Sequence, residues 1–138
     1  VLEACLQLQG LVDCIVAPYE ADAQLAHLVR EKYVDVVITE DSDLILFGCD
    51  KILFKLDRTG NGLLFEQDNL SASLGNHATS FTLDKFRHMC ILSGCDYLDS
   101  LPNIGLSKAF KFFSATHQPD LEKALRKLPY TLRMSSLV

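Results

Sequence analysis

Five of the seven carboxylates in residues 20–43 lie in two short acidic clusters. The first cluster contains Glu20 and Asp22, and the second contains Glu40, Asp41 and Asp43. Carboxylates this close together repel one another, and hard divalent cations such as Mg²⁺ or Mn²⁺ bind their oxygens and neutralise them. The sequence therefore predicts a site for divalent metal ions.

A further acid, Asp96, lies in a later loop that we expect to fold back towards these clusters. A pair of Mg²⁺ ions about 3.5–4 Å apart activates a water molecule and stabilises the leaving oxygen in phosphodiester hydrolysis. We interpret five acids as the catalytic ligands of such a pair: Glu20, Asp22, Asp41, Asp43 and Asp96. The alternative for any one of them is a helix cap or a solvated loop residue.

The spacing of the acids indicates which of them face the metal. Successive side chains of an extended strand point to opposite sides, so Asp41 and Asp43 are expected to project together. Glu40 then points away, and we leave it out of the ligand set. Glu20 and Asp22 belong to the start of a helix, where we expect only one of the two to bind the metal directly.

Each acidic cluster follows an apolar run that is typical of a buried strand, at residues 12–17 and 34–39. Between them, apolar residues at helical spacing predict a helix over residues 20–32, with two acids in its first turn. This strand, helix, strand order is typical of a parallel α/β sheet, whose ligands lie beyond the carboxyl ends of the strands. Both clusters fall at that edge.

Several other elements complete the predicted fold. They are the end of a helix at residues 2–11, β-like segments at 44–48 and 51–56, a turn at 57–62 leading into a strand at 63–66, a brief helix and a loop at 68–81, and a last helix at 119–128 that ends at Pro129. The β-like segments and the strand after the turn predict a hairpin at the edge of the sheet.

The C-terminal part of the chain predicts two helices joined by a tight connection. Thr82 can cap the first helix, which runs to about Ser93, and the connection at residues 100–109 opens the second. Gly105, and Asn103 by its tolerance of positive φ, suit a helix-hairpin-helix turn whose backbone N–H groups bind a DNA phosphate. We expect four residues to contact DNA: Asn103, Gly105, Ser107 and Lys108. A plain connection between helices is the alternative.

Composition indicates one compact domain with a real core. The chain has 138 residues, of which 49% are hydrophobic and 22% charged. No apolar stretch approaches the roughly 18 residues that span a bilayer, so no membrane association is expected and an intracellular protein is the default. The five cysteines lack Cys-x-x-Cys spacing and are expected to be reduced and buried; a zinc site with His88, Cys90 and Cys95 is a weaker alternative.

Charge is distributed unevenly along the chain. The net charge is −5, and residues 1–50 hold ten acids against two bases. Residues 105–133 hold six bases against two acids. An acidic pocket beside a basic face suits an enzyme that binds phosphates with one region and cleaves with metal ions in another, although an ordinary solvated surface is the alternative.

Read together, four motifs resemble the structure-specific 5′ nucleases that include flap endonuclease. They are APYEADAQLA at residues 17–26, ITEDSD at 38–43, GC at 48–49 and CILSGCDYL at 90–98. The resemblance covers nearly the whole chain, and it matches the internal region of these enzymes. It implies an α/β, PIN-like parallel-sheet 5′ nuclease fold with a hairpin and a C-terminal helix-hairpin-helix. Residues 1–81 would form the α/β part with the metal site, and residues 82–138 the DNA-binding part of the same domain.

The resemblance also implies site residues. Glu20, Asp22, Asp41, Asp43 and Asp96 match the metal-site acids of the family, which binds two Mg²⁺ ions or Mn²⁺ in their place. Three positions match residues whose oxygens hold K⁺ or Na⁺ at the hairpin, through which a duplex phosphate is bound: Ser93, Ser100 and Ile104. Asn103 stands where Gly is expected, and Pro102 stands where a basic residue is expected. Both differences lower the expected affinity of this turn for a phosphate.

The function that the resemblance implies is 5′→3′ exonuclease action on double-stranded DNA together with 5′ flap cleavage. It implies action in the nucleus in DNA repair, including mismatch repair and recombination. Mismatch-repair proteins would be bound by regions outside this chain. The family's site also uses two aspartates and a helical arch from an earlier region, so we expect this chain alone to have little or no activity. The alternatives are a PIN-like ribonuclease and a DNA-binding scaffold without catalysis.

Overall fold

The computed structural model describes residues 10–74, 81–116, 118 and 120–132. Its chain divides into two compact units, Val1–Gln67 and Asp68–Val138. The predicted helix end at residues 2–11 falls mainly on residues 1–9, which lie outside the described residues. The predicted division of the domain at residue 81 stays a prediction.

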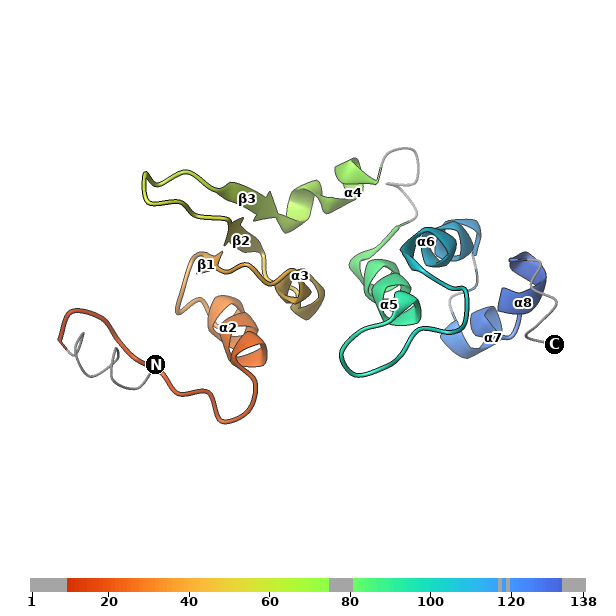
Figure 1. The fold of residues 1–138 in the computed structure, drawn as a ribbon, viewed down its shortest axis with the longest axis horizontal. Helices are drawn as coiled ribbons and strands as arrows, with labels where there is room; N and C mark the ends of the chain where they lie inside the picture. Colours follow the sequence, from red (N-terminus) through yellow and green to blue (C-terminus); the bar gives the residue numbers. More distant parts are fainter. Residues whose placement is uncertain (1–9, 75–80, 117, 119, 133–138) are drawn as a thin grey trace. The chain divides into compact units, whose positions relative to one another are not determined.

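The first unit is a small mixed sheet with two helices (Figure 1). Its elements are α2 (Ala21–Arg30), β1 (Val37–Ile38), α3 (Asp43–Phe47), β2 (Lys51–Phe54) and β3 (Leu63–Glu66). The strand order is β1-β2-β3; β1 pairs with β2 in parallel and β2 pairs with β3 antiparallel. The predicted helix, second strand and edge hairpin are thus observed, and the prediction of an α/β fold is confirmed.

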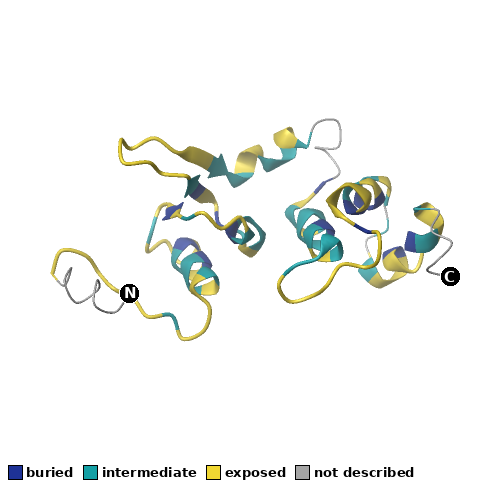
Figure 2. Ribbon diagram, in the orientation of Figure 1, coloured by how far each residue is buried: buried dark blue, intermediate teal, exposed yellow. Residues whose placement is uncertain are grey.

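The predicted strand at residues 12–17 is wrong for the described structure, in which Val12 forms a single β-bridge and residues 13–17 are irregular. Ile15 and Val16 are 62% and 85% exposed, and Figure 2 shows most of this segment in the exposed colour. A strand needs a neighbour to bind its backbone N–H and C=O groups, and the described sheet offers none to these residues. Apolar composition alone therefore misled the prediction.

The predicted β-like segment at residues 44–48 is also wrong, because these residues form α3 and its cap. Gly48 ends the helix in the left-handed conformation with φ of 85°. The backbone nitrogens of Gly48 and Cys49 donate to the carbonyl oxygens of Ile45 and Leu44 at 3.1 and 3.2 Å. Such a glycine is a common helix stop, and this signal outweighs the apolar run before it.

The core of the first unit lies between α2, α3 and the sheet. Its buried members are Ala26, Val29, Val37, Leu44, Cys49 and Ile52. Leu44, Cys49 and Ile52 are fully buried. They place α3 and β2 in one core, and Leu44 so anchors the α3 end of the loop that carries the second acidic cluster.

The second unit is helical. A short 3₁₀ turn (η1, Gln67–Asn69) leads into it, and its helices are α4 (Leu70–Ser73), α5 (Leu83–Ser93), α6 (Leu106–Ala115), α7 (Leu121–Leu125) and α8 (Leu128–Thr131). Its buried core consists of Phe81, Met89, Ile104, Ala109, Phe112, Phe113, Ala124 and Leu128. The core packs α5 against α6, which lie side by side in Figure 1.

Two details of this unit bear on the predictions. Thr82 caps α5 as predicted, its hydroxyl oxygen accepting a hydrogen bond from the Lys85 backbone nitrogen at 3.3 Å. The predicted last helix is instead two short helices, and Pro129 lies in the first turn of α8 rather than at a helix end. The first turn tolerates proline because its N–H groups have no partner within the helix. Within the described residues, no helix is long and apolar enough to cross a membrane.

Candidate functional site

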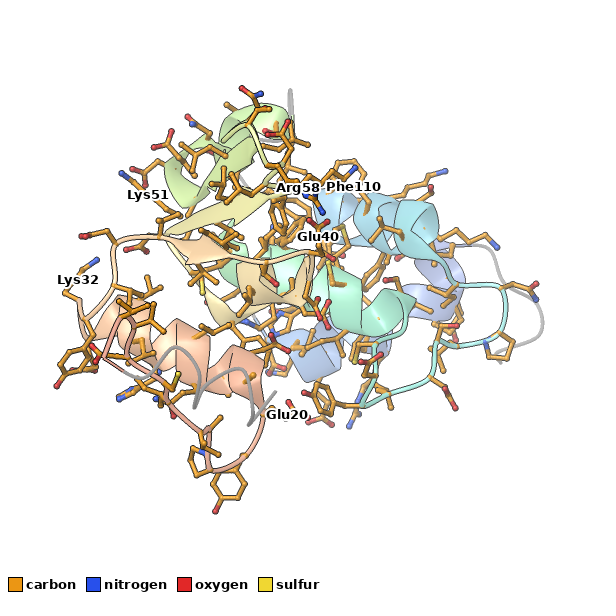
Figure 3. The ribbon with its side chains drawn as sticks, turned by 60° about the vertical axis from the view of Figure 1, so that its left-hand side comes forward. Glu20, Lys32, Glu40, Lys51, Arg58 and Phe110 are labelled. Atoms are coloured by element: carbon orange, nitrogen blue, oxygen red, sulfur yellow. The ribbon has the colours of Figure 1, made fainter. Side chains whose placement is uncertain are left out.

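The first acidic cluster lies at the N-terminal end of α2, where Figure 3 labels Glu20; Lys32 lies beyond the opposite end. Glu20 occupies the position before the helix, and its side chain makes no capping hydrogen bond. Its carbonyl oxygen accepts from the Gln24 backbone nitrogen at 3.3 Å. Asp22, half-buried, lies in the first turn. The reading of Glu20 as a helix cap is therefore not supported.

Asp22 is electrostatically linked to both acidic clusters. Partial burial, the charge of Asp41 and the charge of Glu20 raise its pKa, in that order of size. An acid in the first turn of a helix is normally favoured by the helix dipole. Desolvation and repulsion therefore dominate at Asp22, and they identify Glu20, Asp22 and Asp41 as one negative patch within the first unit.

The second cluster forms a turn into α3 rather than a strand exit. The Asp41 backbone nitrogen donates to Oγ1 of Thr39 at 3.0 Å, and Oδ1 of Asp41 accepts from the Asp43 backbone nitrogen at 2.9 Å. Asp43 is the first residue of α3. Strand alternation, on which the sequence argument for Asp41 and Asp43 rested, is thus the wrong geometry here. Asp41 takes on part of a capping role, and Glu40 is exposed on the same loop (Figure 3).

Asp96 belongs to the second unit, at the tip of a tight turn. Cys95 and Leu98 exchange backbone hydrogen bonds of 2.9 and 3.1 Å across this turn. Among the described residues, no group of three or more His, Cys, Asp or Glu side chains is arranged to hold a metal ion. The convergence of all five predicted ligands stays a prediction.

The predicted monovalent-cation residues lie where the connection between α5 and α6 begins and ends. The hydroxyl of Ser93 donates to the carbonyl oxygen of Cys90 at 2.7 Å. Gly94 follows with φ of 103°, and a Cβ there would lie 3.1 Å from the nitrogen and from the Cβ of Ser100. This close approach brings the end of α5 next to Ser100.

A second tight turn closes the connection. The Ile104 nitrogen donates to the carbonyl oxygen of Leu101 at 2.9 Å, and Asn103 between them has φ of 62°. Proline at the second position and positive φ at the third are the pattern of a type II turn, so Pro102 and Asn103 both fit their places. The side chain of Ile104 is 2% exposed and anchors this turn in the core.

The predicted DNA contacts follow at the start of α6. Gly105 is the residue before the helix, and its carbonyl oxygen accepts from the nitrogens of Lys108 and Ala109 at 3.1 and 3.0 Å. Asn103, Gly105, Ser107 and Lys108 are all exposed. The four residues thus share one exposed stretch at an N-terminal helix end.

The sequence reasoning missed two contacts of the first unit. Thr39 orients the Asp41 backbone, and a Thr two residues before an Asp is the available signal for it. Lys32 pairs with Asp50 at 2.9 Å, which no short-range pattern indicated. The prediction of buried cysteines holds for Cys49, whose thiol pKa is raised first by burial and then by Asp50 and Asp22, but Cys14 is exposed.

The family model of the XPG I-region matches residues 11–96, so the chain belongs to the XPG I-region family. Within it, the chain resembles exonuclease 1: the protein of Drosophila melanogaster is 58% identical over 126 residues, which cover 91% of this chain and 17% of that protein. The chain thus spans about a sixth of this relative. The resemblance inferred from the motifs is confirmed.

Solved structures support the fold. The catalytic core of Rad2 in complex with DNA substrate has a TM-score of 0.71 at 22% identity, over 96% of this chain and 47% of that one. The Holliday junction-resolving enzyme GEN1 in complex with product DNA and Mg²⁺ has a TM-score of 0.68 at 26% identity, over 85% and 30%. The chain therefore has the fold of the XPG-type nucleases.

Proposed function

We propose that this chain is the internal part of a metal-dependent, structure-specific 5′ nuclease. The whole protein would degrade double-stranded DNA in the 5′→3′ direction and cleave 5′ flaps, acting in the nucleus in DNA repair, including mismatch repair and recombination. The observation that carries the proposal is the grouping of acids around Asp22 in the first unit, where partial burial and then the charges of Asp41 and Glu20 raise the pKa of Asp22. Enzymes of phosphodiester hydrolysis gather carboxylates in this way to hold cations.

The donor set fits Mg²⁺ in chemistry, because carboxylate oxygens are the ligands that hard divalent cations prefer. Glu20, Asp22, Asp41, Asp43 and Asp96 would hold the ions. Two bound Mg²⁺ ions, or Mn²⁺ in their place, supply an activated water and stabilise the leaving oxygen. Thr39 and the start of α3 would orient Asp41 for this task.

The connection between α5 and α6 would act as a helix-hairpin-helix that binds duplex DNA. Its tight turns and exposed start of α6 support this role. Asn103, Gly105, Ser107 and Lys108 would face the phosphate backbone. K⁺ or Na⁺ would bind at three residues and share a phosphate oxygen with the protein: Ser93, Ser100 and Ile104. The close approach of Gly94 to Ser100 supports this placement.

The partners proposed are double-stranded DNA with 5′ ends, nicks or flaps, and mismatch-repair proteins bound through regions outside this chain. Two alternatives remain distinct in their predictions. A PIN-like ribonuclease would cleave RNA in preference to DNA, and a scaffold would bind DNA without cleaving it.

The test is cleavage of a 5′-recessed or nicked duplex by the full-length protein with and without Mg²⁺. We expect Asp41→Asn and Asp43→Asn each to reduce cleavage by about 10²–10³-fold, the usual cost of losing one group that stabilises the transition state, while duplex binding persists. Glu40→Gln is the matched control, because Glu40 is an exposed acid in the same loop outside the proposed ligand set. It should leave cleavage within a few-fold of wild type.

Each result separates the alternatives. Unchanged cleavage in both Asp variants would make the acids structural and contradict the proposal. Duplex binding with no Mg²⁺-dependent cleavage by the wild type would favour the scaffold. Faster cleavage of an RNA strand of the same sequence would favour the ribonuclease.

A further inference from the structure

The exposed side of α6 is positively charged and free of carboxylates. The helix contains no Asp or Glu, and Lys108 and Lys111 are both exposed. Neither lysine forms an ion pair with any residue that the structure describes. Ala109, Phe112 and Phe113 are buried on the other side of the helix. The charge of this side is therefore uncompensated.

The next helix shows the opposite arrangement. Lys123 pairs with Asp120 at 3.2 Å, and Arg126 pairs with Glu122 at 2.6 Å. Both pairs join neighbours on successive turns of the same region, so the positive charges of α7 are matched locally. A polyanion gains more from the unmatched lysines of α6, since it displaces no carboxylate to reach them.

Geometry extends this positive side beyond the start of the helix. Lys108 and Lys111 are three residues apart, which is about 4.5 Å along the helix axis and on the same side of it. Lys108 belongs to the proposed phosphate contact at the N-terminus, whereas Lys111 lies close to one turn further on. A flexible ammonium group at that position can reach a neighbouring phosphate of the same duplex.

We propose that Lys111 contacts a second phosphate of the bound duplex, so that the protein contacts the DNA along α6 and not only at the first turn of this helix. The inference rests on the proposed function and adds to it the direction and length of the contact between the duplex and α6. The phosphate contact carries no base preference. Lys111 is a positioning residue in this account.

The experiment measures duplex affinity of the full-length protein by fluorescence anisotropy. The probe is a 5′-recessed duplex in EDTA, which prevents cleavage, with KCl varied from about 50 to about 200 mM. Each lost phosphate contact reduces the slope of log affinity against log salt by about 0.9. We expect this reduction for Lys108→Ala and for Lys111→Ala, and rescue of the wild-type slope by Lys111→Arg.

Lys123→Ala is the matched control, because it removes the same charge from an exposed helix position whose lysine is already paired. It should leave the slope unchanged, and an equal reduction there would show that net charge alone matters and would overturn the proposal. An unchanged slope in Lys111→Ala, with a reduced slope in Lys108→Ala, would confine the DNA to the hairpin and also overturn it. Failure of the wild type to bind the duplex would instead remove the proposed function.

Discussion

The Cα of Gly94 lies so close to Ser100 that an added Cβ would be 3.1 Å from both the nitrogen and the Cβ of that serine. This contact joins the end of α5 to the far side of the Asp96 turn. Contacts at that distance are tighter than real Cβ atoms normally make, and φ of 103° at Gly94 is a conformation essentially confined to glycine. Two independent constraints therefore require glycine at this position.

Gly94→Ala is expected to destabilise the protein by about 1–3 kcal/mol, the usual cost of holding a side chain in such a conformation. Denaturation by urea, followed by circular dichroism, measures the change. Gly105→Ala is the control, since Gly105 has negative φ and nothing lies within 4 Å of its added Cβ. Equal losses in both variants would show that the Ser100 contact is unimportant.

The charge of Asp22, a proposed metal ligand, is expected to lower the stability of the metal-free protein. Because partial burial and the charges of Asp41 and Glu20 raise its pKa in the folded protein, ionisation of Asp22 opposes folding. This penalty is complete above the folded pKa, decreases as pH falls through the folded pKa, and is absent below the unfolded pKa. We expect Asp22→Asn to stabilise the metal-free protein at pH 7, by no more than about 0.5 kcal/mol because solvent screens the charges around Asp22. Thermal unfolding in EDTA measures the effect, and a lower midpoint would contradict it.

With Mg²⁺ bound, the wild type is expected to be more stable than Asp22→Asn. A cation that binds only the folded state raises its stability in proportion to the logarithm of its concentration over Kd. The thermal midpoint of the wild type is therefore expected to rise with Mg²⁺ and to fall again when EDTA is added. The midpoint of Asp22→Asn should respond less. Equal responses of the two proteins would exclude Asp22 as a ligand.

The hairpin turn between β2 and β3 should be sensitive to acid. Hydrogen bonds to the Asp57 carboxylate, first from the Thr59 hydroxyl and then from backbone and side-chain groups of Asn61 and Thr59, lower its pKa to about 2. A lowered pKa stabilises the folded state above the unfolded value, near 3.8, and this contribution is lost as pH falls towards 2. Asp57→Ala should remove it.

The readout is the thermal midpoint between pH 2 and pH 6. We expect the difference between wild type and Asp57→Ala to be largest above pH 4 and to shrink at lower pH. Arg58→Ala is the control, because Arg58 is exposed in the same turn, whose described side-chain hydrogen bonds join Asp57, Thr59 and Asn61. A constant difference across the pH range would mean that the carboxylate charge is not the cause.

The cap of α5 provides a test of the stability of the helix that precedes the connection to α6. Thr82→Ala removes the hydroxyl that accepts from the Lys85 nitrogen, and we expect a loss of about 1 kcal/mol in the free energy of unfolding. Thr82→Ser keeps the acceptor and should retain most of the stability. If the Ser and Ala variants unfold at the same urea concentration, the hydrogen bond contributes nothing.

Local signals predicted the elements whose determinants are close in sequence. The turn at Asp57 and the cap at Thr82 each depend on residues within four positions, and both were anticipated. The positive φ of Asn103 likewise followed from its residue type. Gly48 is a signal for the end of a helix, but the apolar run before it was given more weight. The predicted strand at residues 44–48 was therefore wrong.

The candidate site was only partly accessible from the sequence. Types and spacing selected the acids as candidates, and the pKa of Asp22, raised by partial burial and then by Asp41 and Glu20, agrees with one patch in the first unit. The turn that places Asp41 against the start of α3 depends on tertiary packing of Leu44 and could not be read from alternation. Whether residues 12–17 form a strand depends on a neighbouring strand to pair with them, which short-range patterns do not specify, and the described sheet offers none.

The two core clusters of the chain share no residue: one draws on α2, α3 and the sheet, and the other on Phe81 and the helices after it. Amide hydrogen exchange reports the free energy of local opening, and its slowest protons mark the centres of cooperative units. Two separate sets of slowly exchanging amides are therefore expected, one around Ile52 and one around Phe112. The acids of the first unit and the connection between α5 and α6 in the second would then belong to parts of the chain that unfold locally at different rates.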